Sequence, residues 1–111
     1  FEIWIAPYRR TSNIFELSEN EQKDLAELML DASKSLDKVF DDPMPYTLAW
    51  QLSPKGYENS YHFHVCFQPI RRSKTKLKYL AGVEQISGFF LVDLPPERSA
   101  RILRGEELPD E

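Results

Sequence analysis

Both histidines of the chain and its single cysteine lie close together, as His62, His64 and Cys66. In an extended strand the side chains alternate between two faces, so these three residues and Gln68 are predicted to project from the same face. Neutral imidazole nitrogens can bind a metal, transfer a proton or contact a phosphate. The spacing alone does not choose among these roles, because protein metal sites usually need at least one further ligand.

The alternate positions of this stretch are apolar: Tyr61, Phe63, Val65 and Phe67. This pattern predicts a central strand over residues 61–69 that buries one face and presents its reactive groups on the other. A purely structural role for the histidines stays open. Cys66 lacks a second cysteine at metal-binding spacing, and such a residue is more often a small buried hydrophobe.

The elements before this stretch are predicted to form the sheet and the helix that position it. Residues 1–6 alternate apolar and polar up to Pro7 and read as a strand. Ser18 and Glu21 form a capping box that opens a helix of about twenty residues. Its apolar stripe consists of Leu25, Leu28, Met29, Ala32, Leu36, Val39 and Phe40. A strand over residues 46–52 and a turn-rich connection then predict an antiparallel hairpin with the histidine strand.

The part after Pro69 is expected to carry a basic loop, a strand and a last helix. The loop spans residues 71–78, and a segment with a permissive glycine, Gly82, follows it. Residues 86–92 read as a strand, and Pro96–Leu103 as a helix that Gly105 ends. The predicted class is α+β: an antiparallel, histidine-triad-like sheet with one long helix packed on it and a short C-terminal helix.

Length and composition indicate a single domain, since 111 residues with 41% hydrophobic content suffice for one core. A net charge of −4 argues against nucleic-acid binding. One cysteine, no signal peptide and no long apolar run point to the cytoplasm and away from membranes. The chain opens apolar at Phe1, so we expect residues 1–111 to be one histidine-triad-like domain of a longer, two-domain polypeptide.

Several stretches resemble the C-terminal half of the galactose-1-phosphate uridylyltransferases, which are members of the histidine-triad superfamily. They are Ile5–Arg10 before a Leu-Ser-capped helix, Phe40–Tyr46, Tyr61–Pro69 and Arg72–Glu84. In this family the first half carries a His-Pro-His nucleophile that takes up uridylate from UDP-glucose and passes it to galactose 1-phosphate. This chain has no His-Pro-His, so the resemblance implies a supporting role beside an N-terminal half, in a homodimer, with sugar phosphate and nucleotide sugar as substrates.

The resemblance also implies which residues act. The residues that would grip the hexose phosphate are Lys78, Tyr79, Gly82, Val83 and Glu84. His62 and His64 match the ligands of a structural metal site, for which zinc is the expected ion. Gln51 stands where relatives often have a histidine ligand, and Cys66 where they carry Glu or His, so we expect this site to be incomplete.

Two other functions are compatible with the same residues. The chain could be a free-standing histidine-triad hydrolase or transferase in which His64 attacks the phosphorus of a nucleotide. It could also be a catalytically silent domain that serves dimerisation. Turnover by the isolated chain, lost when His64 is replaced, would favour the first of these alternatives.

Overall fold

The computed structural model describes residues 1–79, 82–89 and 94–109 of the chain. The strands are β1 (Ile3–Ile5), β2 (Tyr46–Gln51), β3 (His64–Pro69), β4 (Arg71–Ser73) and β5 (Lys76–Leu77). The helices are a 3-10 turn η1 (Ile14–Glu16) and the α-helices α1 (Glu19–Val39), α2 (Gly82–Ser87) and α3 (Pro96–Leu103). This composition confirms the predicted α+β class.

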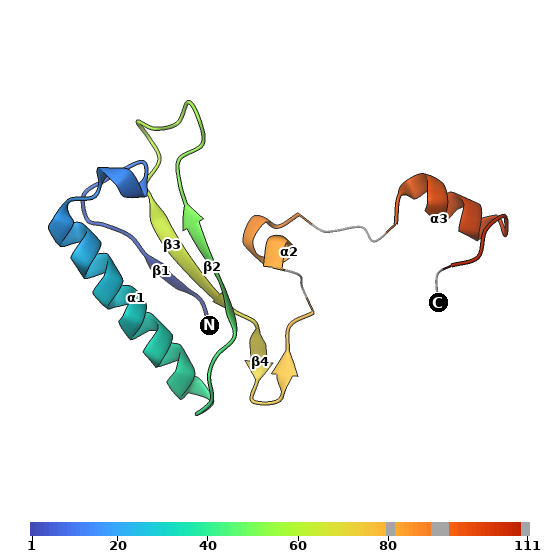
Figure 1. Cartoon of the computed structure of the whole chain (residues 1–111), viewed down its shortest axis with the longest axis horizontal. Helices are drawn as coiled ribbons and strands as arrows, with labels where there is room; N and C mark the ends of the chain where they lie inside the picture. The colour runs from blue at the N-terminus through green and yellow to red at the C-terminus, as the bar shows by residue number, and fades with distance from the viewer. Residues whose placement is uncertain (80–81, 90–93, 110–111) are drawn as a thin grey trace.

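The main sheet has three strands in the order β1-β3-β2, so the histidine-bearing β3 lies in the centre (Figure 1). Both neighbours run antiparallel to it, which confirms the predicted hairpin of β2 and β3. Ile3 lies opposite Phe67 and Leu48 also lies opposite Phe67, so the apolar positions of all three strands share one face. Both outer strands leave one edge unpaired within this sheet.

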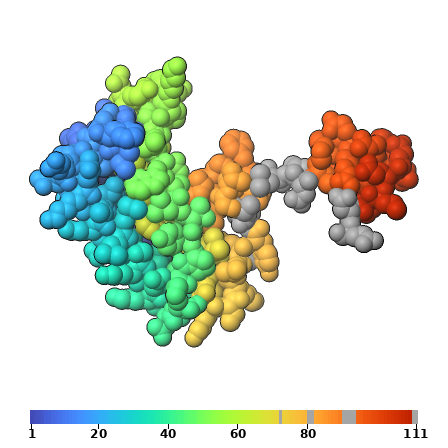
Figure 2. Space-filling model, viewed as in Figure 1, coloured from blue at the N-terminus to red at the C-terminus, as the bar shows by residue number. Residues whose placement is uncertain are grey.

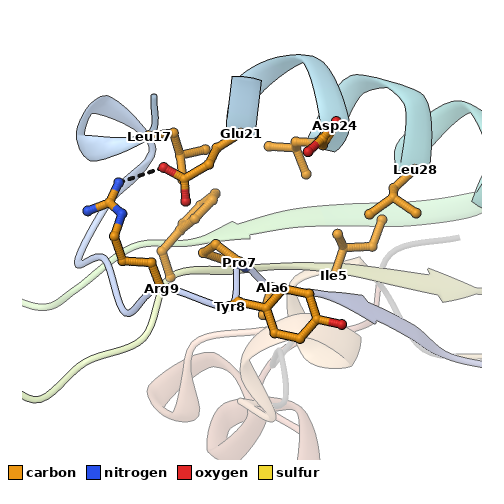
Figure 3. A pocket seen from close by; sticks show the side chains of 11 residues that line it. Ile5, Ala6, Pro7, Tyr8, Arg9, Leu17, Glu21, Asp24 and Leu28 are labelled. Atoms are coloured by element: carbon orange, nitrogen blue, oxygen red, sulfur yellow. Dashed lines mark hydrogen bonds and ion pairs between the residues drawn. The ribbon is translucent and has the colours of Figure 1, made fainter. Parts of the chain in front are cut away.

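Helix α1 covers the apolar face of the sheet (Figure 1). Its start is the predicted capping box: the Ser18 hydroxyl accepts from the Glu21 amide, while the Glu21 carboxylate accepts from the Ser18 amide. Ala32 and Leu36 of its stripe are buried. The prediction fails for Leu28 and Val39, which are 50% and 37% exposed. Leu28 lines cavities beside Ile5 and Ala6 (Figure 3), and Val39 is the last residue of the helix.

The core joins α1, the loop residues before it, and β3. Its buried members are Leu17, Ala32, Leu36, Met44, Phe63, Val65 and Phe67. Because Phe63, Val65 and Phe67 are each at most 1% exposed, the period-two prediction holds for the inner face of β3. Burying such side chains contributes about 1.5–3 kcal/mol each, and this makes β3 the centre of stability as well as of the sheet.

Three predicted elements need correction. The central strand begins at His64 rather than at residue 61, because the Phe63 amide donates to the Thr11 carbonyl (2.7 Å) and not to a neighbouring strand. The basic stretch 71–78 contains the small hairpin of β4 and β5 instead of a loop. Of the strand predicted over 86–92, its first two residues belong to α2; residues 90–92 lie outside the described part of the chain.

The molecule is elongated, with Cα extents of 62 × 43 × 16 Å. Its radius of gyration is 19.5 Å, whereas a compact domain of this length has about 13 Å. Figure 2 shows that α3 forms a lobe of its own, away from the sheet. The bounds predicted for this helix are confirmed, and Gly105 follows it with a φ of 76°, which only glycine adopts at low cost. Within the described residues, no helix is both long and apolar enough to span a bilayer.

Candidate functional site on the outer sheet face

The face of the sheet opposite α1 collects the reactive side chains. Strand register places Trp4 of β1 and Ala49 of β2 directly beside Cys66. The same register sets Gln51 opposite His64, which sequence could not fix. Residues directly opposite one another share a face, and their Cβ atoms lie about 4.5–5.5 Å apart. An imidazole, a thiol, an amide and an indole therefore gather on this face.

The His64 ring is held between aromatic neighbours. It stacks on Trp4 with ring centroids 4.8 Å apart and lies 6.1 Å from the ring of Tyr61. Its Nδ1 donates to the His62 carbonyl (3.0 Å), so Nε2 keeps a lone pair for a proton or a metal ion. Tyr61 was predicted to face the core; it precedes β3, and its ring lies beside His64 instead.

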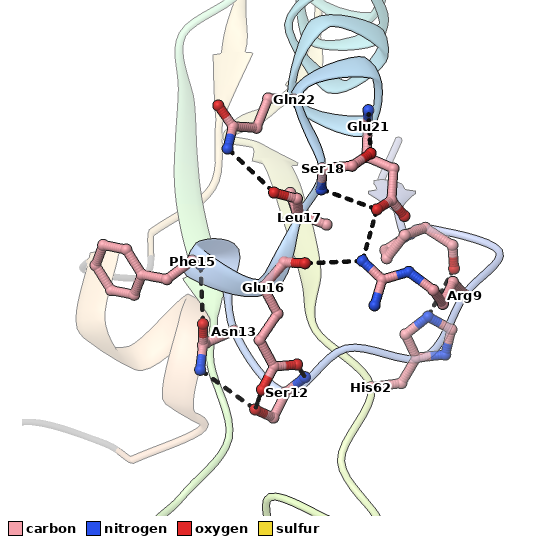
Figure 4. A network of polar contacts seen from close by, with 11 residues as sticks. Arg9, Ser12, Asn13, Phe15, Glu16, Leu17, Ser18, Glu21, Gln22 and His62 are labelled. Atoms are coloured by element: carbon pink, nitrogen blue, oxygen red, sulfur yellow. Dashed lines mark hydrogen bonds and ion pairs between the residues drawn. The ribbon is translucent and has the colours of Figure 1, made fainter.

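His62 lies in the loop before β3 and is exposed. Its Nε2 donates to the Pro7 carbonyl at 2.7 Å (Figure 4), so the ring ties this loop to the segment after β1. Only Nδ1 of this imidazole is left for another partner. The alternation of a strand does not extend to His62, so the two histidine rings are placed by separate backbone anchors.

Cys66 is 3% exposed. Burial raises the pKa of its thiol above the ordinary value, the negative charge of Glu2 adds to this, and a hydrogen bond with the Gln51 side chain opposes it. The thiol therefore stays protonated at neutral pH, and a thiol is a poor metal ligand and nucleophile compared with a thiolate.

The fit of a metal ion can be judged from these donors. Two imidazoles each keep one free nitrogen and donate the other to a carbonyl, as metal-binding histidines do. Gln51 and Cys66 bond to each other, and neither supplies a strong zinc ligand. Among the described residues, no three His, Cys, Asp or Glu side chains come close enough together to hold an ion. The donors among the described residues by themselves do not fit a zinc site.

The residues predicted to grip a sugar phosphate lie at the other end of the same face. The Glu2 carboxylate accepts from Trp4 and Gln68, and these bonds, together with the charge of Lys78, lower its pKa. Lys78 is fixed through its amide, which donates to the Ile70 carbonyl at 2.6 Å. The next residue, Tyr79, is 94% exposed.

Helix α2 carries Gly82, Val83 and Glu84, the remaining predicted sugar-binding residues. Gly82 packs beside Thr47, where a Cβ atom would lie 3.7 Å from the threonine hydroxyl oxygen. Gln85 anchors the helix through its Nε2, which donates to the main-chain carbonyls of Gln68 (3.1 Å) and Pro69 (3.3 Å). Val83 is half exposed and Glu84 is partly buried.

The two groups of predicted site residues share a face but lie at opposite ends of it. His64 begins β3, and Gln68 near its end marks where α2 docks. Four residues of strand separate them, which corresponds to about 13 Å. Among the described residues, the structure therefore places the histidines away from Lys78, Tyr79 and α2, and their functional roles stay predictions.

The polar loop between β1 and α1 is held by buried side chains and by hydrogen bonds. Thr11 and Ser12 are 0% and 2% exposed. The Ser12 amide and hydroxyl both donate to the Glu16 carboxylate, at 2.8 and 2.7 Å, and this lowers the pKa of Glu16 (Figure 4). Arg9 donates to the Glu21 carboxylate at 2.6 Å, and Arg10 to the carbonyl of Tyr61 at 3.0 Å. Both arginines thus bond to groups of the fold itself.

No family model matches the chain. A protein from Thermotoga maritima named galactose-1-phosphate uridylyltransferase is 35% identical to it and covers 97% of the chain, while the chain covers 35% of that protein. Proteins of the same name from Cryptococcus neoformans and Haemophilus influenzae are 34% and 29% identical and cover 98% and 94% of the chain. A solved structure described as a uridylyltransferase superposes with a TM-score of 0.66 at 32% identity, over 95% of the chain and 34% of that structure.

Fold and sequence thus agree on a likeness to part of the proteins named uridylyltransferase. The resemblance to the C-terminal domain of galactose-1-phosphate uridylyltransferase is confirmed over nearly the whole chain. The chain spans about one third of the length of the relatives it matches. Sequence reasoning missed Glu2 and Trp4 as neighbours of the site; their alternation against Ile3 and Ile5 was visible, but only the strand register showed which residues they meet.

Proposed function

We propose that the chain acts as the C-terminal, hexose-phosphate-binding part of a uridylyltransferase that moves uridylate between UDP-glucose and a hexose 1-phosphate. The observation that carries this proposal is the likeness, at up to 35% identity over nearly the entire chain, to proteins named for that reaction. Phosphoryl transfer depends mainly on positioning and on charge compensation. A domain without the nucleophile can therefore still be essential to the reaction.

The segment from Lys78 to Glu84 would hold the acceptor sugar. The Lys78 ammonium would pair with the phosphate, since charge-assisted hydrogen bonds to phosphate are among the strong ones. The Glu84 carboxylate would accept from sugar hydroxyls. Tyr79, exposed beside them, would present its ring to the hexose, while Gly82 and Val83 shape the binding segment.

The proposal includes an N-terminal half with the covalent nucleophile, a homodimer and a cytoplasmic location. In this proposal zinc binds at His62 and His64 only if polypeptide outside this chain supplies further ligands. Two imidazoles with free nitrogens would then be the contribution of this domain. A zinc ion there would stabilise the fold, and no step of the transfer needs it.

The test is a uridylyl-transfer assay on the full gene product with UDP-glucose and galactose 1-phosphate. Lys78→Ala and Glu84→Gln are expected to raise the KM for the hexose phosphate by about tenfold or more. Lys76→Ala is the matched control, because this lysine is exposed on the same hairpin. Equal effects of all three variants, or no transfer by the unchanged protein, would overturn the proposal.

A second candidate is nucleotide hydrolysis by His64 without any partner half. The observation in its favour is the Nδ1 bond to a carbonyl, which leaves Nε2 free and oriented, as a nucleophilic histidine requires. Turnover of UDP-glucose by residues 1–111 alone that is lost in His64→Ala would establish it. A third possibility is a silent dimerisation domain, which predicts no turnover by the full gene product or by residues 1–111 alone.

A further inference from the structure

A carboxylate lies between the two groups of site residues on the outer face. It belongs to Glu2, which directly precedes β1. Since Ile3 lies opposite Phe67, the residue before it falls beside Gln68. The Oε1 atom of Glu2 accepts from Nε1 of Trp4 and, at 3.3 Å, from Nε2 of Gln68. Within the described part of the chain, no hydrogen bond is made to its second oxygen, Oε2. Glu2 is therefore anchored through one oxygen and has the other available.

Trp4 connects this carboxylate with the histidine end of the face. Its indole N–H donates to Glu2, while its ring stacks on His64 with centroids 4.8 Å apart. An exposed glutamate usually gains little from a nearby cation, because both flexible side chains must first be ordered. Here the bonds from Trp4 and Gln68 already restrain the carboxylate, so less side-chain entropy is lost when a cation approaches. Glu2 can thus restrain a neighbouring cation in turn.

Lys78 lies at the same end of the sheet as Glu2. Its amide donates to the carbonyl of Ile70 at 2.6 Å, and Ile70 comes two residues after Gln68. The hydrogen bonds from the indole and the amide lower the pKa of Glu2 most, and the positive charges of Lys78 and of the Phe1 amino group lower it further. Glu2 and Lys78, both within the described residues, form no direct ion pair. The carboxylate therefore attracts the ammonium without occupying its donors.

We propose that Glu2 is a positioning residue of the acceptor-sugar site: its anchored carboxylate keeps the Lys78 ammonium over the outer face, where the ammonium pairs with the phosphate of a hexose 1-phosphate. The inference rests on the proposed function, since it takes Lys78 as the phosphate ligand. A carboxylate that only added negative charge would repel the phosphate, so its removal would strengthen binding. A carboxylate that orients the lysine strengthens binding by its presence. The direction of the effect therefore distinguishes the two cases.

The test measures uridylyl transfer by the full gene product with UDP-glucose and galactose 1-phosphate. Glu2→Gln keeps an oxygen that accepts from Trp4 and removes the charge. The KM for galactose 1-phosphate is expected to rise by about threefold, as for one exposed charge pair, with kcat within about twofold. Glu27→Gln is the matched control, because Glu27 is an exposed glutamate of α1, on the other side of the sheet, and it should leave KM unchanged. A fall in KM in Glu2→Gln, or equal effects of the two variants, would overturn the inference.

A double-mutant cycle tests whether Glu2 acts through Lys78. In the background of Lys78→Ala, the further change Glu2→Gln should leave KM unchanged, because the ammonium that Glu2 restrains is gone. A merely structural role of Glu2 would raise KM in both backgrounds by the same factor. Such additive effects would overturn the inference, even if Glu2→Gln alone raised KM as expected.

An NMR titration of the full gene product separates this inference from the proposed function. The side-chain nitrogen signal of Lys78, assigned by its loss in Lys78→Ala, should shift as the Glu2 carboxyl ionises, and this shift should vanish in Glu2→Gln. The shift without any uridylyl transfer would support the hold of Glu2 on Lys78 and count against the proposed function. Transfer without the shift would support the proposed function and overturn the inference.

Discussion

Replacement of Leu36 by alanine tests whether α1 packs on the sheet as described. Leu36 is 2% exposed and lies in the core with Phe63, Val65 and Phe67. The substitution removes three buried carbon atoms, worth about 2.4 kcal/mol at ~0.8 kcal/mol each. The cavity left behind adds to this, so the free energy of unfolding should fall by about 3 kcal/mol. Against a total of about 5–15 kcal/mol for a domain, that is a large loss.

Leu30→Ala is the control on the same helix. Leu30 is 54% exposed, so the same three carbon atoms contribute only about 1 kcal/mol there. In urea, with a slope of about 1.5 kcal/mol per molar, the midpoint should fall by about 2 M for Leu36→Ala and by about 0.7 M for Leu30→Ala. The fluorescence of Trp4 and Trp50 reports the transition. Equal shifts for the two variants would refute the packing of this helix face on β3.

The remaining predictions concern a thiol, a carboxylate and a metal. Cys66 should react with a disulfide reagent at about pH 8 at least about tenfold more slowly in the folded than in the unfolded chain, because burial raises its pKa; equal rates would contradict its burial. The pKa of Glu16 is lowered by its bonds from Ser12, so the stability it contributes is complete above the unfolded pKa and is lost as pH falls through the folded one. In Glu16→Gln the urea midpoint should accordingly depend less steeply on pH between about pH 5 and pH 3. An unchanged pH dependence of the midpoint would refute this. Gln51→His places an imidazole opposite His64 and should make the melting temperature rise with added zinc, which the unchanged chain should show more weakly; equal responses would argue against the strand register.

The elements that sequence predicted well are those with a local signature. Alternation identified β1 and the inner face of β3, and the Ser18–Glu21 capping box gave the start of α1 to within a residue. The pair Pro95-Pro96 and Gly105 bounded α3, which the structure confirms. In each case the information lies within a few residues along the chain. Short-range backbone preferences are therefore enough to find it.

The site depended on information that is not local. The neighbours of His64 are Trp4 and Gln51, which lie on separate strands. A shift of one residue in the register of β1 would replace Trp4, and a shift in that of β2 would replace Gln51. Period-two reasoning also ran too far back, because Phe63 bonds to the Thr11 carbonyl and ends the ladder there. Alternation of side chains says nothing about where hydrogen bonding to the next strand begins.

Residues 86–92 show the opposite failure. Their apolar character suggested a strand, yet Ile86 falls in α2, whose position is set by the Gln85 amide bonded to the carbonyls of Gln68 and Pro69. A side chain that donates to the main-chain carbonyls at the end of a strand can fix the position of the helix that carries it. Tertiary contact of this kind overrides a weak local preference for β-structure.

The exposed side of α1 and the two groups of site residues lie on opposite faces of the same narrow sheet. A three-stranded sheet is narrow, so it covers only part of α1, and Leu28 stays half exposed. The opposite, outer face holds His64 at one end and the Lys78 segment at the other. Binding a sugar phosphate tightly requires walls that exclude water and fix its orientation.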